Sequence, residues 1–329
     1  MRILLLVLTA ASFSCKKESW VPNPTVSTNL LNPNQPAPAA YSGTAARSAT
    51  DNLLMGNPSG ATANVVATTN YLMSKTQYSL SYNSVQGKPN WVSWHLDPTW
   101  LGTAARCDCF ASDAALPTGW YKVGSTSYSG SGFDRGHMCP SADRTLSSTD
   151  NAATFLMTNM IPQAPMNNQR TWAYLEDYAR KLVTQGNECY IICGSYGVGG
   201  TGSNGGVTTT INSGKITVPS NVWKVIVVIP QGTGDIARVT TATRVIAVNT
   251  PNINSINSAW GGYRTSVDAI EAATSYDLLS ALPTSVQTVI EAKIDNGPTQ
   301  LISSKCLVEV WLMVRPFLFK YSIIIKSIR

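Results

Sequence analysis

Apolar and polar residues alternate in two short segments of the chain, and three more apolar segments follow them. Residues 78–82 and 90–96 alternate with a period of two, which predicts half-buried strands. The segments 189–193, 222–229 and 239–248 are predominantly apolar and predict further strands. The pattern therefore indicates a protein with a substantial β-sheet.

Residues 168–185 follow a different period, which predicts a helix. Trp172, Leu175, Ala179 and Leu182 recur at i, i+3, i+7 and i+10, so that they form one apolar stripe. We expect this stripe to pack against the sheet.

Turn and capping residues mark further boundaries. Thr265 and Asp268 have the spacing of a capping box and predict the start of a helix, and residues 285–294 predict a second amphipathic helix. Glycine-rich segments at 124–132 and 194–206 predict loops. No Gly-Lys-Ser/Thr follows the second segment, which therefore indicates turns rather than a phosphate-binding loop.

The net charge of the chain is weak evidence for binding to nucleic acid. Charged residues make up only 13% of the chain, and this suits a secreted, loop-rich protein. The net charge is +6, but residues 305–329 contribute +4 and Arg2 adds one more, so residues 3–304 carry about +1. Binding to a polyanion must therefore come from a local cluster of basic residues.

The N-terminus has the pattern of an export signal. Arg2 precedes an apolar run at residues 3–11, and small residues lead from this run to Cys15. We predict a signal peptide at residues 1–14. Cys15 followed by two lysines resembles a bacterial lipoprotein signal, with Cys15 lipidated; the alternative is an ordinary secretory peptide. We expect an exported lipoprotein of the outer membrane, cell surface or periplasm, or else a secreted protein.

Composition divides the rest of the chain into three parts. Residues 15–69 are rich in Pro, Asn, Ser, Thr and Ala, which predicts a flexible linker. We expect an ordered domain at residues 70–297. Residues 298–329 form an atypical basic and apolar tail, too charged to predict a transmembrane helix; it is either a membrane-surface segment or a reading-frame artefact.

Six cysteines besides Cys15 would allow disulfides in an exported protein. Neither the close pair Cys107 and Cys109 nor the pair Cys189 and Cys193 is well spaced for a bond within the pair. Zinc-binding spacing is absent. The six are Cys107, Cys109, Cys139, Cys189, Cys193 and Cys306.

His137 is one of only two histidines, and it stands in the sequence Asp134-Arg-Gly-His137. Histidine takes up a proton near neutral pH, which suits a general base. A lone histidine is nevertheless more often structural, and we interpret the other one, His95, in that way. Residues further along the chain favour the catalytic interpretation of His137.

Residues downstream of His137 complete a known pattern. The chain resembles the DNA/RNA non-specific endonuclease family, whose signature is a DRGH box followed by a helix with Asn-x-x-x-Trp-x-x-x-Glu-x-x-x-Arg. The likeness covers about residues 70 to 295. The residues that carry it, besides 134–137, are 158–163, Asn167, Asn168, Trp172, Leu175, Glu176 and Arg180.

The resemblance implies both a fold and an activity. It implies an α+β, ββα-metal nuclease fold with a central antiparallel sheet flanked by helices. It also implies an endonuclease that depends on Mg²⁺, with Mn²⁺ as a substitute, and that cleaves both DNA and RNA to leave a 5′-phosphate. The alternative function is a catalytically silent nucleic-acid-binding surface lipoprotein.

The resemblance also assigns roles to the base and the metal site. His137 is the general base, and Asn168 is the only direct protein ligand of the metal. A single ligand suits Mg²⁺, which keeps several of its waters. At 100° per residue, Glu176 and Arg180 lie about 80° and 120° from Asn168 around an α-helix. Glu176 is therefore placed to hold metal-bound waters, although a surface ion pair with Arg180 is the alternative.

The remaining roles concern the phosphate and the loop. Arg106 and Arg180 are expected to contact the phosphate. Asn159 is expected to position the site or, alternatively, to be a buried amide bonded to backbone. Asp134 is expected to organise metal waters or the loop. Cys139 replaces a small residue of the family and either pairs with Cys107 or Cys109 or is a buried free thiol.

Overall fold

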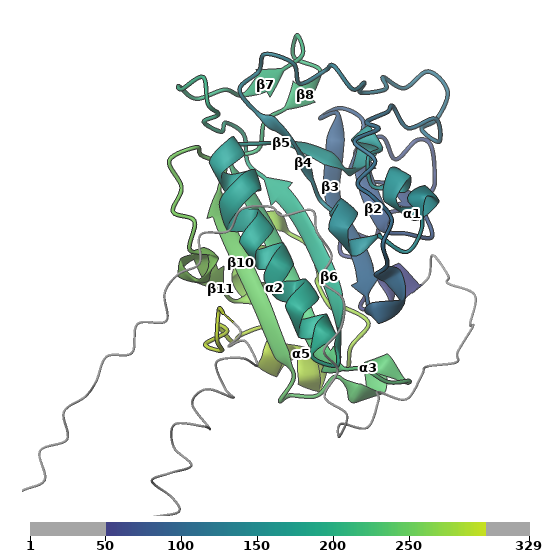
Figure 1. The fold of residues 1–329 in the computed structure, drawn as a ribbon, viewed down its shortest axis with the longest axis vertical. Coiled ribbons are helices and arrows are strands. Elements are labelled where there is room, and N and C mark those ends of the chain that lie inside the picture. The colour runs from purple at the N-terminus through teal and green to yellow at the C-terminus, as the bar shows by residue number, and fades with distance from the viewer. Residues whose placement is uncertain (1–50, 301–329) are drawn as a thin grey trace, which may run out of the picture. The chain divides into compact units, whose positions relative to one another are not determined.

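A seven-stranded sheet runs through residues 51–300, which are the residues that the computed structural model describes (Figure 1). The strand order is β1-β2-β3-β6-β9-β10-β11, and every neighbouring pair is antiparallel. The strands are β1 (Tyr71–Ser74), β2 (Ser79–Asn83), β3 (Lys88–Leu96), β6 (Asn187–Tyr196), β9 (Asn221–Pro230), β10 (Arg244–Pro251) and β11 (Arg264–Thr265).

All five predicted strands are present in this sheet, and the largest boundary error is at the start of β10. We predicted a strand from residue 239, but β10 begins at Arg244. The short helix α3 (Asp235–Arg238) and a turn closed by the Thr243 N–H donating to the Thr240 carbonyl occupy the preceding residues. Val239 is buried there, although it is not in a strand.

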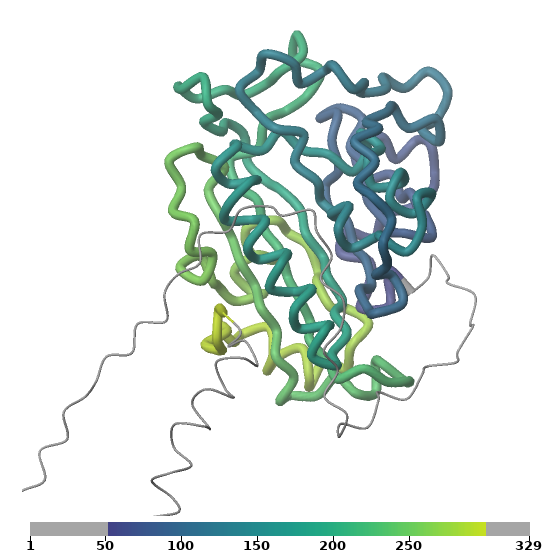
Figure 2. Tube along the Cα trace, viewed as in Figure 1, coloured from purple at the N-terminus to yellow at the C-terminus, as the bar shows by residue number. Residues whose placement is uncertain are grey.

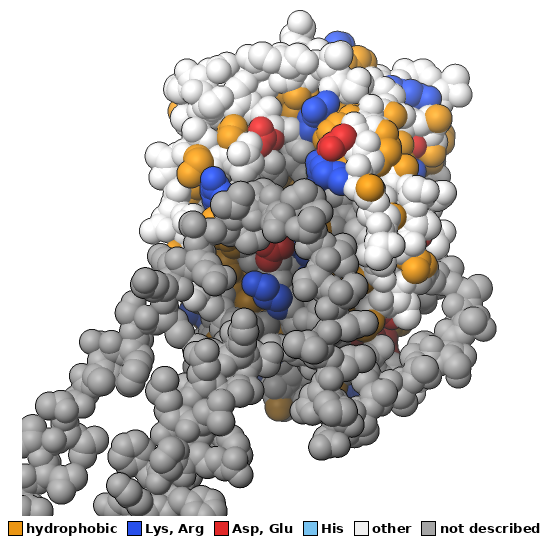
Figure 3. All heavy atoms as spheres, viewed as in Figure 1, with side chains coloured by type: hydrophobic (Ala, Val, Ile, Leu, Met, Phe, Trp, Pro, Cys, Tyr) orange, Lys and Arg blue, Asp and Glu red, His pale blue; other side chains and the backbone are white. Residues whose placement is uncertain are grey.

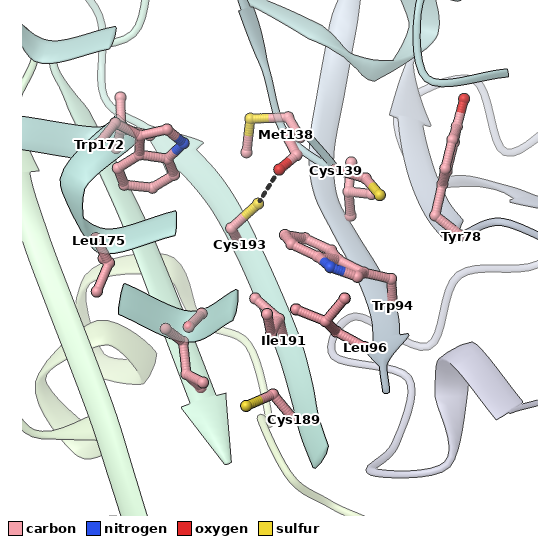
Figure 4. Packing of buried hydrophobic residues seen from close by; sticks show 14 of the residues in the cluster. Tyr78, Trp94, Leu96, Met138, Cys139, Trp172, Leu175, Cys189, Ile191 and Cys193 are labelled. Atoms are coloured by element: carbon pink, nitrogen blue, oxygen red, sulfur yellow. Dashed lines mark hydrogen bonds between the residues drawn. The ribbon is translucent and has the colours of Figure 1, made fainter. Parts of the chain in front are cut away.

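Alternation along the strands gives the sheet two apolar faces. On β6, Cys189, Ile191 and Cys193 pack on one face, whereas Tyr190 and Ile192 pack on the other. Figure 4 shows Trp172 and Leu175 facing the first set. The sheet is therefore buried on both faces.

One long helix covers the first face. Helix α2 (Ala173–Thr184) lies over β6 and β10 in Figure 1. It is preceded by a π-helical turn, η5 (Asn167–Trp172). The predicted stripe is confirmed, since Trp172, Leu175, Ala179 and Leu182 are all buried. The π turn is wider than an α turn, so the angles that we derived from an ideal α-helix do not apply across it.

Shorter helices pack on the opposite face. Helix α4 (Val267–Thr274) begins one residue later than the capping box predicts, because the Ser266 hydroxyl is the cap and accepts from the Ala269 N–H. Helix α5 (Thr284–Ile290) ends four residues before the predicted end. Val267, Ile270 and Ile290 join the apolar cluster on this face.

A strand–strand–helix unit stands beside the main sheet. Strand β4 (Asp134–His137) pairs antiparallel with β5 (Met160–Gln163), and the chain then enters η5 and α2, as the tube in Figure 2 also shows. The other elements are β7 (Thr210–Ile211), β8 (Ile216–Thr217), α1 (Ser148–Ala153), η1 (Asp51–Leu53), η2 (Pro98–Trp100), η3 (Ser141–Asp143), η4 (Met157–Asn159) and η6 (Trp260–Tyr263).

The folded region begins before Asn70, where we placed the end of the linker. Met55 and Ala61 are buried in the apolar cluster on the α4 and α5 face. The predicted signal peptide, Cys15, Cys306 and the segment 301–329 lie outside the described residues. Within residues 51–300, no helix has the length and apolarity needed to cross a membrane.

Candidate active site

The pairing of β4 with β5 fixes the position of His137. His137 lies opposite Met160, and Asp134 lies opposite Gln163. Packing leaves no space for a side chain at Gly136. A Cβ there would lie 2.3 Å from Gln163 Oε1. The glycine therefore allows β4 and β5 to approach closely between Asp134 and His137.

Asn159 holds the chain just after His137. Its side chain is buried and bonds only to backbone: Nδ2 donates to the carbonyls of Cys139 and Thr154, and Oδ1 accepts from the Cys139 N–H at 3.0 Å. The Met138 N–H donates to the Asn159 carbonyl. Asn159 is therefore a buried amide bonded to backbone, and its role in positioning the active site stays a prediction.

The imidazole of His137 lies between two aromatic rings. The ring centroids of Phe110 and Phe155 are 5.6 and 4.8 Å from its own, both edge-to-face. Its Nε2 is buried and has no hydrogen-bond partner among the described residues. Burial, followed by the charges of Arg106 and Arg135, lowers the pKa of His137 to about 3. The imidazole is therefore neutral at physiological pH, which is the form that accepts a proton.

Asn168 meets the other end of the DRGH box. Its Nδ2 donates to Asp134 Oδ2 at 2.8 Å, and the Nε2 of Gln169 donates to the same oxygen at 2.9 Å. Both amides come from the π turn η5. The π turn thus joins α2 to β4 through Asp134, and it leaves Asn168 Oδ1 available as a ligand.

A cleft of about 390 Å³ gathers these groups. Arg106, Asp134, Arg135 and Asn168 line it, and so does Phe110, whose ring contacts His137. Figure 3 shows basic side chains beside acidic ones on this face, in the region where Figure 1 places β4 and β5. The structure therefore brings three of the predicted site residues, Arg106, Asp134 and Asn168, into one cleft beside His137.

The two arginines of the cleft are held by different partners. The Nε of Arg106 donates to Asp108 Oδ1 at 2.7 Å and its Nη1 donates to the Ser141 hydroxyl, while half of the side chain remains exposed. The guanidinium of Arg135 lies 3.7 Å from the ring centroid of Phe110. Arg135, to which the sequence analysis gave no role, also lines the cleft.

Glu176 and Arg180 lie behind the cleft rather than in its lining. Glu176 pairs with the buried Lys224 at 3.3 Å, and burial raises the pKa of Glu176 despite this cation. Nη1 of Arg180 donates to the buried Asp143 at 2.8 Å, and its Nη2 pairs with Asp177. In this conformation the guanidinium of Arg180 is engaged by carboxylates, and its expected contact with phosphate stays a prediction.

Lys224 and Asp143 complete a buried charge network that the sequence analysis missed. Lys224 Nζ lies 4.3 Å from the ring centroid of Trp172, and Asp143 also accepts from the Trp94 indole N–H at 2.9 Å. One signal was present in the sequence: Lys224 is the only charged residue within the apolar run 222–229. A lone charge in a buried strand needs a partner, and here the partner is Glu176.

The cysteines pair differently from our expectation. Cys107 and Cys109 form a disulfide with each other, and Cys139, Cys189 and Cys193 are buried free thiols. Asp108 between the bonded cysteines has φ 48°, and this left-handed turn brings their Cα atoms within 5.1 Å. The spacing argument failed because it assumed extended backbone. The alternative that Cys139 is a buried thiol is confirmed, and burial raises the pKa of this thiol to about 12.

Comparisons with known proteins identify the family of the chain. The family model for DNA/RNA non-specific endonucleases matches residues 56–285. A nuclease from Nostoc sp. is 51% identical over 244 residues, which is 74% of this chain and 86% of that protein. Nuclease C1 from Cunninghamella echinulata is 35% identical over 167 residues, 49% of this chain and 66% of that protein. The chain therefore belongs to the DNA/RNA non-specific endonuclease family and is a nuclease.

A solved structure supports the fold in its own right. A crystal structure of the EndoG/EndoGI complex addresses the mechanism of EndoG inhibition. One chain of that structure matches the present chain with a TM-score of 0.59 at 23% identity. The match covers 73% of this chain and 95% of that one. The predicted α+β, ββα-metal nuclease fold with a central antiparallel sheet is confirmed.

Proposed function

We propose that the chain is a Mg²⁺-dependent endonuclease that hydrolyses phosphodiester bonds of both DNA and RNA and leaves a 5′-phosphate, with Mn²⁺ as a substitute metal. One observation carries the proposal: Asn168, Asp134 and Arg106 converge on one cleft beside a histidine that burial keeps neutral. These are the groups that phosphodiester hydrolysis requires, namely a base, an oxygen ligand for a hard cation and a cation for the phosphate.

The residues of the cleft fit a hard divalent cation. The bond from Asn168 Nδ2 to Asp134 fixes the plane of the amide and so commits its nitrogen, which leaves the carbonyl oxygen as a ligand. Oxygen ligands are those that Mg²⁺ prefers, and this ion commonly keeps several waters. Asn168 would hold the ion, and Glu176 would orient its waters. A bound Mg²⁺ supplies charge stabilisation at the phosphate oxygens.

The protein side chains then divide the remaining work. His137 takes the proton of the attacking water, and Asn159 holds the backbone that positions the imidazole. Arg106 contacts the scissile phosphate from the exposed half of its side chain. Arg180 is the second expected phosphate contact; in that role it would exchange Asp143 or Asp177 for substrate.

Our proposal for the location of the enzyme rests on the N-terminal sequence alone. We propose export and anchoring through a lipid on Cys15, which would place the nuclease at the outer membrane, cell surface or periplasm. Release as a secreted enzyme is the other outcome of the same export signal, and the nuclease proposal is the same in both cases.

A plasmid-nicking assay tests the enzymatic proposal against a catalytically silent nucleic-acid-binding lipoprotein. Wild-type protein should convert supercoiled DNA to nicked and linear forms in Mg²⁺, should degrade single-stranded RNA, and should do neither after chelation. His137→Ala provides the control for contaminating nuclease. Binding without cleavage by the folded wild-type protein in Mg²⁺ would leave the silent binder as the better description.

A further inference from the structure

Three carboxylates gather on the face of the sheet opposite the active-site cleft. Asp268 and Glu271 lie on α4, and Glu291 directly follows α5. Their oxygen atoms lie within 4.8 Å of one another. Residues of α4 and α5 belong to the apolar cluster on this face, whereas Trp172 and Met138 belong to the cluster on the other face. The sheet therefore separates the two sites.

Backbone hydrogen bonds fix the three carboxylates relative to one another. The N–H groups of Val267 and Asp268 donate to the Glu291 carbonyl at 2.9 and 3.2 Å, which ties the first turn of α4 to the end of α5. Glu271 Oε1 accepts from the Leu278 N–H at 2.6 Å. The backbone positions that carry the three residues are therefore fixed, and so is the carboxylate of Glu271.

Glu291 gives an independent sign of a missing partner. The residue is 6% exposed, and its Oε1 is buried with no hydrogen-bond partner among the described residues. Buried polar atoms in folded proteins are nearly always satisfied by protein, water or an ion. A carboxylate oxygen of Glu291 lies within 4.8 Å of oxygens of Asp268 and Glu271, so the partner that these surroundings favour is a cation.

No ion pair among the described residues compensates the charge of the cluster. Within residues 51–300, none of the ion pairs includes Asp268, Glu271, Glu291 or the neighbouring Asp277. Three carboxylates whose oxygens lie within 4.8 Å of one another repel unless positive charge joins them.

We propose that Asp268, Glu271 and Glu291 form a second cation site, which binds Ca²⁺ and stabilises the junction of α4 and α5. Ca²⁺ fits this ligand set because it takes six to eight oxygens in flexible geometry, including bidentate carboxylates and waters. Asp268 is exposed and Glu271 is partly exposed, which leaves one side of the site open to water. Zinc is disfavoured because the cluster offers neither sulfur nor nitrogen.

Calorimetric titration of the full chain with Ca²⁺ tests the proposal. The Asn168→Ala variant is titrated alone and after a further Glu291→Gln or Asp268→Asn substitution, so that the active-site cleft does not contribute. We expect one Ca²⁺ per chain in Asn168→Ala, and a loss of at least about tenfold in affinity in both double variants. Asp268→Asn changes an exposed side chain and keeps the proposal testable if Glu291→Gln fails to fold.

Thermal unfolding and activity complete the test. Ca²⁺ should raise the Tm of wild type and of Asn168→Ala, but should have little effect on Glu291→Gln or Asp268→Asn. Both cluster variants should keep the Mg²⁺-dependent nuclease activity. The Ca²⁺-site proposal and the nuclease proposal are therefore tested independently. Absence of Ca²⁺ binding in Asn168→Ala, or an equal Ca²⁺-induced rise in Tm for all variants, would overturn the proposal.

Discussion

Asn168 and Asp134 lie 34 residues apart in sequence, and a single hydrogen bond of 2.8 Å joins them in the cleft. This bond connects the π turn that begins the long helix to the strand that ends in His137. The Asn168 amide, which we propose as the metal ligand, and the DRGH box are thereby held in a fixed relative position. π-helical segments inside α-helices are frequent at functional sites, and here the segment presents Asn168 and Gln169 to the same carboxylate.

Removal of the base should abolish cleavage without loss of the fold. We expect His137→Ala to lower kcat by about 10²–10⁴, because a positioned general base contributes on this order. Its imidazole forms no hydrogen bond through Nε2 among the described residues, so its removal leaves no partner unsatisfied there. Circular dichroism and plasmid nicking check the variant. Cleavage near the wild-type rate by folded His137→Ala would remove His137 from the mechanism.

The pH profile should reflect the buried imidazole. Because burial, Arg106 and Arg135 lower the pKa of His137 to about 3, the neutral base persists as the pH falls. The acid limb of kcat/KM in the free enzyme should therefore have its midpoint below about 6.5, the ordinary value for histidine. Arg106→Gln removes one nearby positive charge and should move that midpoint upward. A wild-type midpoint at or above 6.5 contradicts this environment.

Loss of the amide ligand should uncouple the enzyme from its metal. Asn168→Ala should abolish activity and weaken Mg²⁺ binding, whereas Asn168→Asp should retain part of both. Asp134→Asn should cost about 10–100-fold in activity, because it weakens the orientation of Asn168 without removing the ligand. Gln169→Ala is the matched control, since Gln169 donates to the same oxygen from an exposed position. Unchanged Mg²⁺ affinity in Asn168→Ala would exclude it as the ligand.

The arginine variants separate phosphate binding from structural pairing. Arg106→Lys should lower kcat/KM, because lysine lacks the planar fork for phosphate. Arg180→Lys should lower both kcat/KM and Tm, because a lysine ammonium lacks the planar guanidinium that pairs with Asp143 and Asp177 at once. Arg170→Lys on the exposed side of η5 is the control and should change neither quantity. Kinetics and thermal melts decide, and equal kcat/KM in all four proteins would reject the phosphate role.

The N-terminal cysteine should determine where the protein resides. Wild-type protein expressed in a Gram-negative host should partition with membranes, because a lipid with two or three acyl chains is enough for stable attachment. Cys15→Ser should release it or block its processing, while Cys139→Ser serves as a control outside the signal. Mass spectrometry of the mature N-terminus gives the direct readout. An unlipidated terminus downstream of Cys15 would mean a secreted enzyme.

Much of the fold and part of the site could be predicted from local sequence patterns. Alternation predicted strands β2 and β3, and the 172–182 stripe predicted the buried side of α2, because burial of one face imposes a fixed period on each element. The DRGH box and Asn168 identified the family for the same local reason: these residues lie in short, contiguous motifs. The start of β10 and the cap of α4 were misplaced by a few residues, because tertiary contacts decide where an element ends.

Only the tertiary structure decided which charges meet. Nothing in the sequence pairs Lys224 with Glu176, or Asp143 with Arg180, since these partners come from different elements and are brought together by the packing of α2 on the sheet. The disulfide of Cys107 with Cys109 depended on the backbone angle at Asp108. A periodic sequence specifies which face of each element is buried, but long-range pairing depends on how those faces stack, and that information is not local.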